Sequence, residues 1–283
     1  MNKTIKLNDG SAIPALGFGT WCIDDDKAAD AVKTAIEAGY RHIDTAQAYG
    51  NERGVGLGVR ESGIARDEIF VVSKVEAENK SYRSAAESID RTLDKTGLDY
   101  MDMMIIHSPQ PWAEWRGEKR YFEENREVWR ALEDAKSDGK VKTIGVSNFL
   151  IDDLTELLPH CKIKPAVNQV LAHIGNMPEE LIRFCKDNGI AVEAYSPIAH
   201  GEAQKSEAIV KTAEKYHVSP ATLCIKYIIE RGLIALPKAS SRKHIFENAA
   251  LCFSVSAEDM EMLGNLDFKE YGEFSFFPVF SGK

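Results

Sequence analysis

The sequence predicts an α/β protein folded as a (β/α)8 barrel, with a short N-terminal β-hairpin that closes the bottom of the barrel. Three observations favour this fold. Eight short apolar segments end in polar residues, as buried parallel strands do. Helical patterns separate most of these segments. No low-complexity linker divides the chain, so we expect a single domain over residues 1–283.

The predicted strands are spread over the whole chain. They cover residues 13–20, 40–44, 69–74, 100–107, 141–147, 165–169, 190–196 and 233–238. Upstream, the segment 4–16 contains Asn8-Asp9-Gly10, a turn sequence that predicts the hairpin.

Four helices are predicted from apolar residues at helical spacing. They cover residues 26–39, 81–97, 123–140 and 178–189. The first stops at Gly39, and the second runs from a Ser81 cap to Gly97. Pro178 suits the first turn of the fourth helix.

The main alternative is a doubly wound open sheet, which would have a glycine-rich fingerprint directly after its first strand. The glycine cluster "GVGLG" (54–58) lies ten residues beyond the end of a predicted strand and lacks the GxGxxG order. We therefore interpret 54–58 as a helix segment that tolerates glycine.

The composition argues against several kinds of binding partner, metal site and cellular location. The formal charge of −9 argues against nucleic acid and anionic membranes as partners. Five cysteines without a CxxC motif argue against a disulfide framework or a zinc knuckle, and the histidines show no metal-ligand spacing. The N-terminus has no apolar stretch long enough for a signal peptide, and no run suits a membrane helix. We expect a cytoplasmic protein without a metal.

Polar residues at successive strand ends predict a site. Asp44, Lys74 and His107 end the second, third and fourth predicted strands, and Tyr49 follows on the next loop. In a barrel these strand ends face one mouth. Lys74 would lower the pKa of Tyr49, and Asp44 would hold Lys74 in its charged form. Tyr49 could then act as a general acid, while His107 hydrogen-bonds an incoming oxygen.

Each of these residues also has an ordinary structural interpretation. Asp44 could cap a turn, Tyr49 could pack in the core, and His107 could lie on the rim. Lys74 could point to solvent or act as a Schiff-base nucleophile. Their occurrence at successive strand ends favours a proton-transfer site.

The later strand ends predict a cofactor bed. Ser147 and Asn148 follow the fifth predicted strand, Gln169 ends the sixth, and Tyr195 and Ser196 end the seventh. Amide side chains supply hydrogen-bond donors and acceptors, and the Tyr195 ring offers a flat face for stacking. Beyond the eighth strand, a basic stretch leads into a predicted helix N-terminus, which is a natural phosphate site. Its polar residues are Lys238, Ser240, Ser241, Arg242, Lys243 and His244.

Taken together, these motifs resemble the aldo-keto reductase family over essentially the whole chain. The motifs that carry the resemblance are "GFGTW" (17–21), "GYRHIDTAQAYGNE" (39–52), "LDYMDMMIIH" (98–107), "GKVKTIGVSNF" (139–149) and "AYSP" (194–197). The resemblance implies a barrel that reduces carbonyls with NADPH and lacks a Rossmann loop. It implies that the catalytic residues are Asp44, Tyr49, Lys74 and His107.

The resemblance also assigns cofactor contacts. It implies nicotinamide contacts at Ser147, Asn148, Gln169 and Tyr195, with Thr20 and Trp21 near the cofactor. It places the adenosine 2′-phosphate at Lys238 and the adenine near Glu247 and Asn248. The sequence departs from the family pattern at two positions, with Ala239 in place of a serine and His244 in place of an arginine. Both changes would weaken the binding of the 2′-phosphate, so NADH is the alternative cofactor. Arg242 or Lys243 could compensate.

The expected substrates are small aldehydes, dicarbonyls or keto-sugars. The predicted pocket walls are Trp21, Tyr49, His107 and Trp112, with Trp115 and Phe277 as further candidates. Two other functions remain open: a Schiff-base lyase that uses Lys74, and a redox-sensing cofactor-binding module with slow turnover. We expect a monomer.

Overall fold

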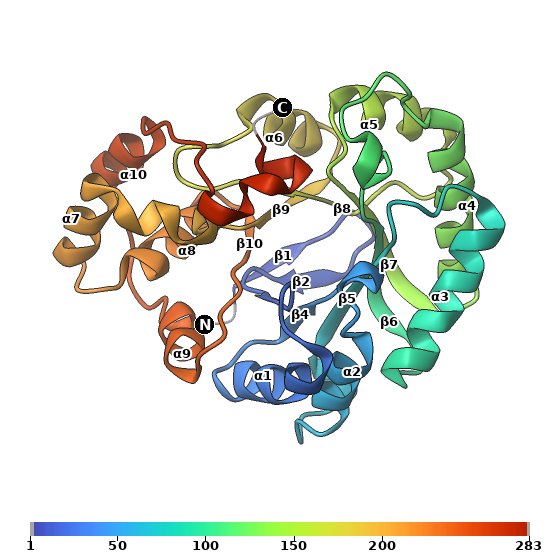
Figure 1. Cartoon of the computed structure of the whole chain (residues 1–283), viewed down its shortest axis with the longest axis horizontal. Coiled ribbons are helices and arrows are strands. Elements are labelled where there is room, and N and C mark those ends of the chain that lie inside the picture. Colours follow the sequence, from blue (N-terminus) through green and yellow to red (C-terminus); the bar gives the residue numbers. More distant parts are fainter. Residues whose placement is uncertain (1–2, 282–283) are drawn as a thin grey trace.

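The computed structural model describes residues 3–281, so residues 1–2 and 282–283 of the predicted domain lie outside the described part. Eight parallel strands form one sheet in sequential order, and helices surround it (Figure 1). The strands are β3 (Phe18–Gly19), β4 (His42–Asp44), β5 (Phe70–Val75), β6 (Met101–Ile106), β7 (Val141–Ser147), β8 (Val167–Leu171), β9 (Ala191–Tyr195) and β10 (Ile234–Leu236).

Backbone hydrogen bonds between the first and last strands close the sheet into a barrel. The Gly17 amide donates to the Ala235 carbonyl at 2.9 Å, and the Gly19 amide donates to the Pro237 carbonyl at 2.9 Å. The Ala235 amide donates to the Ala15 carbonyl, also at 2.9 Å. The predicted (β/α)8 barrel is therefore confirmed.

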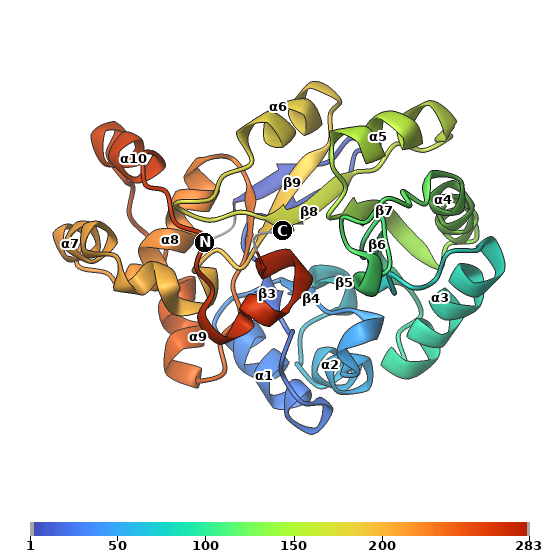
Figure 2. The same ribbon diagram turned by 45° about the horizontal axis from the view of Figure 1, so that its top comes forward.

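Helices surround the outside of the barrel (Figures 1 and 2). Those between consecutive strands are α1 (Asp25–Glu37), α2 (Glu52–Arg60), α3 (Tyr82–Thr96), α4 (Phe122–Ser137), α5 (Ile151–Leu157), α6 (Glu179–Asp187), α7 (Glu207–Lys215) and α8 (Pro220–Glu230). The helices α9 (Arg242–Ala249) and α10 (Ala257–Gly264) follow the last strand. The predicted caps of α3 are confirmed: the Ser81 hydroxyl accepts from the Ser84 amide, and Gly97 has the left-handed conformation.

The predicted hairpin is also confirmed. Strands β1 (Thr4–Lys6) and β2 (Ala12–Pro14) pair antiparallel, and they lie behind the barrel in Figure 1. Leu7 and Ile13 pack with interior side chains from β5, β6, β8 and β10 at that end. The Asn8 side chain donates to the Pro165 carbonyl at 2.7 Å, which fixes the hairpin against the barrel bottom.

The structure divides the predicted strand 13–20 into two. Residues up to Pro14 pair with β1 in the hairpin, whereas Leu16 to Gly19 pair with β10 and β4. One apolar run therefore serves two sheets, which is why hydrophobicity alone merged them. The predicted strand 165–169 lies two residues further along, at Val167–Leu171.

The glycine cluster at 54–58 forms the middle of α2, as predicted, and its glycines allow the helix to approach its neighbours closely. A Cβ atom on Gly54 would lie 2.1 Å from the Asp25 carbonyl oxygen of α1. A Cβ atom on Gly56 would lie 2.0 Å from the Thr96 carbonyl oxygen of α3. The glycines are therefore required by packing.

The C-terminal tail returns across the mouth of the barrel, at the end opposite the hairpin. Two short 3₁₀ helices, Gly272–Phe276 and Pro278–Phe280, lie in front of the strands in Figure 2. This tail places Phe274, Phe277 and Phe280 beside Trp21.

Three further properties concern residues 3–281. They contain no helix that is long and apolar enough to cross a membrane. They contain no group of three or more His, Cys, Asp or Glu side chains arranged to hold a metal ion. All five cysteines have free thiols.

The α2 packing yields a stability prediction. In an ordinary exposed helix, Gly→Ala stabilises by about 1 kcal/mol. We expect Gly56→Ala to lower the free energy of unfolding by about 2 kcal/mol or more, because the new methyl group must displace the α3 backbone. Urea denaturation followed by circular dichroism measures the change. Asp94→Ala on the exposed face of α3 is the control, with an expected change within about 0.5 kcal/mol. An unchanged or raised midpoint for Gly56→Ala would contradict the packing argument.

Candidate active site

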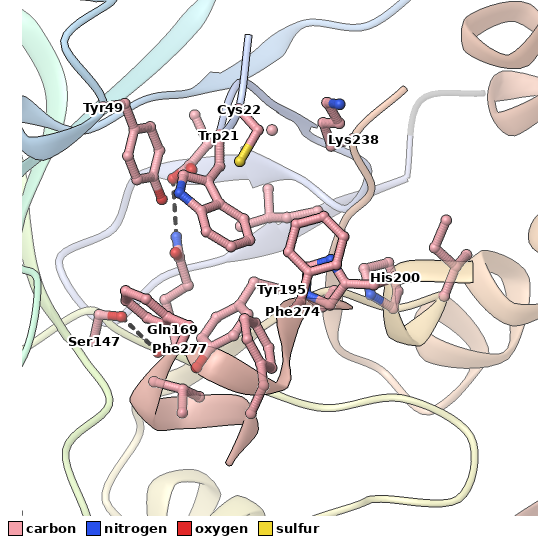
Figure 3. A pocket seen from close by; sticks show the side chains of 18 of the residues that line it. Trp21, Cys22, Tyr49, Ser147, Gln169, Tyr195, His200, Lys238, Phe274 and Phe277 are labelled. Carbon is pink, nitrogen blue, oxygen red and sulfur yellow. Dashed lines mark hydrogen bonds between the residues drawn. The ribbon is translucent and has the colours of Figure 1, made fainter. Parts of the chain in front are cut away.

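A cavity of about 540 Å³ opens at the carboxyl ends of the barrel strands, beneath the C-terminal tail (Figure 3). Side chains from most of the predicted site residues line it. These are Trp21, Asp44, Tyr49, His107, Trp112, Ser147, Asn148, Gln169, Tyr195, Ser196 and Lys238.

A buried ion pair lies at the base of this cavity. Lys74 on β5 is fully buried, and its Nζ lies 2.6 Å from Asp44 Oδ1 at the end of β4. The same Nζ donates to the Thr45 carbonyl at 2.8 Å and to the Tyr49 hydroxyl at 3.3 Å. Burial alone would lower the pKa of Lys74, but Asp44 and Tyr49 outweigh it and the net pKa is raised. Lys74 is therefore an ammonium ion at neutral pH.

Two buried polar residues hold the loop that carries Tyr49. Asn51 accepts from the Thr45 hydroxyl at 2.7 Å and donates to the carbonyls of Thr20 and Ile23 at 2.9 Å. Gln47 donates to Ser88 and Thr92 of α3, and its side-chain oxygen accepts from the Glu76 amide. The position of the phenol is thus set by hydrogen bonds to three neighbouring elements.

The pKa of Tyr49 differs from the expectation. The sequence argument predicts that Lys74 lowers it, and Lys74 does act in that direction. Burial raises it more strongly, however, so the net pKa lies above the ordinary value of 10.0. The phenol is therefore protonated at neutral pH. The Lys74 ammonium ion offsets part of the rise in pKa that burial causes.

His107 lies directly beside the phenol. The rings of Tyr49 and His107 are 5.6 Å apart and meet edge to face, and Trp112 packs on His107 at 5.2 Å. Burial, aided by Lys74, holds the pKa of His107 well below its usual range, so the ring is neutral. Its buried Nδ1 has no hydrogen-bond partner among residues 3–281.

The predicted cofactor bed forms a connected set of polar groups. Asn148 donates to the His107 carbonyl at 3.0 Å and to Ser147 Oγ at 3.0 Å, and accepts from the Tyr195 hydroxyl at 2.7 Å. Gln169 Nε2 donates to Asp44 Oδ2 at 2.9 Å. Asn148 has φ 63°, and Ser196 has φ 51°, so both side chains leave the strand ends from left-handed backbone positions.

Of the residues predicted to bind the cofactor phosphate, only some line the cavity. Lys238 lines it and has no carboxylate partner among the described residues; its Nζ donates to the Ser240 hydroxyl at 2.8 Å. Arg242 is engaged elsewhere, because it donates to Glu37 at 2.8 Å. Four predicted contact residues do not line the cavity and lie on α9 or just before it: Ser240, His244, Glu247 and Asn248.

Thr20 and Trp115 also lie outside this cavity. Thr20 is buried, and its hydroxyl donates to the Asp44 carbonyl at 3.0 Å, so it supports the strand end instead of facing the cavity. Trp115 packs on Trp112 and lines a second hollow of about 190 Å³. Phe277, a further candidate for the pocket wall, does line the main cavity.

Several lining residues were missed by sequence reasoning. His200 stacks on Phe274 with ring centroids 4.1 Å apart, and Phe280 also borders the cavity (Figure 3 labels His200 and Phe274). The aromatic tail was visible in the sequence as "FSFFPVF", but its destination was not. Cys22 and Gln204 also line the cavity, and no sequence pattern around them indicated that they would.

Comparisons with known proteins agree on one family. The sequence model of the Aldo/keto reductase family matches residues 15–267. A glyoxal reductase from Bacillus subtilis is 39% identical, with 94% of each chain covered. The crystal structure of an aldo/keto reductase from Brucella melitensis superposes with a TM-score of 0.88 at 38% identity, covering 94% of this chain and 100% of that one.

A third relative was solved with a bound cofactor. The Bombyx mori aldo-keto reductase in complex with NADP superposes with a TM-score of 0.85 at 32% identity, covering 94% of this chain and 93% of that one. The barrel and the family match extend over the same residues. This chain is therefore an oxidoreductase of the aldo-keto reductase family.

Proposed function

We propose that the chain reduces aldehyde or ketone carbonyls to alcohols with a reduced nicotinamide cofactor, with Tyr49 as the proton donor. The observation that carries this proposal is the convergence of Tyr49, Lys74, Asp44 and His107 at the base of one cavity.

The residues that line the cavity fit a nicotinamide cofactor. The fit rests on a flat Tyr195 ring, the amides of Asn148 and Gln169, and a Lys238 ammonium ion that no carboxylate within residues 3–281 neutralises. Tyr195 would stack on the nicotinamide ring, the amides would bind its carboxamide, and Lys238 would face a phosphate. When bound, the cofactor supplies a hydride to the carbonyl carbon.

The proton comes from the protein. Tyr49 holds a proton at its hydroxyl, and its pKa lies above the ordinary value, so the donor form is populated at neutral pH. As the carbonyl oxygen gains negative charge, Tyr49 donates its proton, and the Lys74 ammonium ion 3.3 Å away stabilises the phenolate that remains. Asp44 keeps Lys74 charged and in place.

His107 orients the carbonyl oxygen. Because its ring is neutral, it presents one N–H donor without competing with Tyr49 as an acid. The neighbouring Trp112 ring and the tail aromatic residues exclude water from the reacting oxygen.

We propose NADPH as the preferred cofactor, with NADH as a weaker alternative. Lys238 lines the cavity at its phosphate end without an ion-pair partner among the described residues. An arginine in place of His244 would tighten the clamp on the phosphate. Arg242 compensates only after leaving Glu37, but their ion pair is exposed and screened by solvent, so it is weak.

The substrates we propose are small aldehydes, dicarbonyls or keto-sugars. The Bacillus subtilis relative is named a glyoxal reductase, which supports small carbonyl compounds. Trp21, Trp112 and Phe277 supply aromatic walls that favour an apolar substituent on the carbonyl.

Neither alternative function is favoured. A Schiff-base lysine must be an uncharged nucleophile, whereas Lys74 is fully buried and paired with Asp44. A slow redox sensor would not require the complete proton-donor arrangement, and two relatives are named a glyoxal reductase and an aldehyde reductase.

We further propose that residues 1–283 act as one domain, as a monomer and in the cytoplasm. The free thiols of the five cysteines support a reducing compartment. Size-exclusion chromatography with light scattering tests the monomer.

The central experiment follows the loss of NADPH absorbance with a panel of aldehydes. We expect Tyr49→Phe to lower kcat by about 10²- to 10⁴-fold, because the proton donor is lost, while NADPH binding measured by tryptophan fluorescence stays within about twofold. The control is Tyr100→Phe, because Tyr100 packs against Arg66 and Lys142 at the start of β6, away from the cavity. Turnover of Tyr49→Phe equal to wild type would overturn the assignment of the acid.

A second experiment addresses cofactor preference. We expect Lys238→Ala to raise the KM for NADPH by about tenfold and to change the KM for NADH by less than about threefold, because only NADPH carries the 2′-phosphate. Lys211→Ala, which removes an exposed lysine of α7 paired with Glu207, is the control for loss of charge. Equal effects on the two cofactors would show that Lys238 does not face that phosphate.

A further inference from the structure

A buried carboxyl group on β9 is connected to the proton-donor arrangement through one amide group. Glu193 is fully buried, and its Oε2 accepts a hydrogen bond from Gln169 Nε2 at 2.9 Å. The same nitrogen donates to Asp44 Oδ2 at 2.9 Å. Gln169 and Glu193 are register partners on adjacent strands, so the backbone itself holds them together.

These two acceptors determine which way the Gln169 amide points. Its nitrogen carries two hydrogens, and both are used, one by each carboxyl group. The opposite orientation would place the amide oxygen against the Asp44 carboxylate. Gln169 therefore keeps its oxygen free for other partners, and its side chain borders the cavity in Figure 3.

On its other side Glu193 faces His42 of β4. Glu193 Oε1 lies 3.6 Å from His42 Nε2, and both atoms are buried without a hydrogen-bond partner among the described residues. His42 Nδ1 lies 3.4 Å from the Pro14 carbonyl oxygen, so Nδ1 carries the proton and Nε2 is an acceptor. Two arrangements would give both orphaned atoms a partner: a proton on Glu193 Oε1 beside a neutral ring, or an imidazolium whose Nε2–H faces an ionised Glu193. A neutral His42 leaves the first of these.

The charges around Glu193 favour the same state. The titratable groups that face Glu193 are Asp44 and His42 from β4 and Lys74 from β5. Its other neighbours are uncharged: Gln169 of β8 and Ile234 of β10. Burial, aided by Asp44, raises the pKa of Glu193 to about 8. Burial lowers the pKa of His42 to about 4. Both groups are neutral at pH 7, so Asp44 and Lys74 are the charged pair in this network.

We propose that Glu193 is a positioning residue of the reductase: its protonated carboxyl group aligns the Gln169 amide with Asp44 and keeps negative charge away from the Asp44–Lys74 pair. This proposal rests on the proposed function. When Glu193 ionises, a second buried carboxylate competes with Asp44 for the Gln169 N–H groups and for the field of Lys74. The ammonium ion then stabilises the developing Tyr49 phenolate less well, so carbonyl reduction slows as the pH rises through about 8.

Glu193→Gln tests this directly, because glutamine copies the protonated acid. Its oxygen accepts from Gln169, and its nitrogen donates to His42. We expect kcat/KM within about twofold of wild type below pH 7, and loss of the alkaline limb centred near pH 8. One pH unit above that midpoint, the variant should exceed wild type several-fold, with about tenfold as the limit for an inactive ionised form. The control is Glu133→Gln, a buried glutamate on α4 that accepts from the amides of Lys162 and Ile163 and does not border the cavity.

A spectroscopic measurement separates this proposal from the proposed function. Infrared difference spectra of wild type against Glu193→Gln, without substrate, should show the C=O stretch of a protonated carboxyl group that disappears as the pH passes about 8. Absence of that band, or pH profiles of wild type and Glu193→Gln that coincide, overturns the positioning role while leaving the reductase intact. Absence of turnover by wild type itself overturns the proposed function, and it is recognised before any variant is compared.

Discussion

The ion pair between Lys74 and Asp44 is the interaction on which the rest of the site depends. Removing two charges from water costs several kcal/mol per ion unless each finds complete compensation. Here it does: the three N–H groups of Lys74 meet Asp44, the Thr45 carbonyl and the Tyr49 hydroxyl, and the second oxygen of Asp44 accepts from Gln169. These partners come from β4, the loop after it, β5 and β8. Closure of the barrel is what brings β8 opposite β4, so the fold and the charged pair require each other.

Burial of this ion pair beside Tyr49 also explains why the Tyr49 hydroxyl is protonated at neutral pH. Burial disfavours the phenolate more than one ammonium ion at 3.3 Å favours it, so Tyr49 keeps its proton, as its proposed role of proton donor requires. The sequence argument named the correct partner but weighed only its charge. Desolvation depends on how the loops and the C-terminal tail cover the cavity, and no single residue encodes that cover. The neutral state of His107 has the same origin.

The parts of the structure that sequence could predict are those encoded locally. Residue type and spacing predict the strand ends at Asp44 and His107, the Ser81 and Gly97 caps, and the hairpin turn. The division of segment 13–20 could not be foreseen, because its two halves differ only in their partners. Glu193 was overlooked for a related reason: a single acidic residue in an apolar strand has no meaning until Gln169 and His42 are known to face it.

The wall of the cavity shows how the fold balances strain against packing. Three non-glycine residues near the end of β9, Ser196, Ala199 and His200, have φ values of 51°, 48° and 54°. Such positions are costly for residues with a side chain and persist only where the surroundings hold them. Here the His200 ring is fixed between Phe274, at 4.1 Å, and Phe280, at 4.4 Å, and its Nε2 lies 3.1 Å from Ser196 Oγ. The C-terminal tail therefore does more than cover the mouth: by packing on His200 it supports the strained segment and, through it, Ser196 in the wall of the cavity.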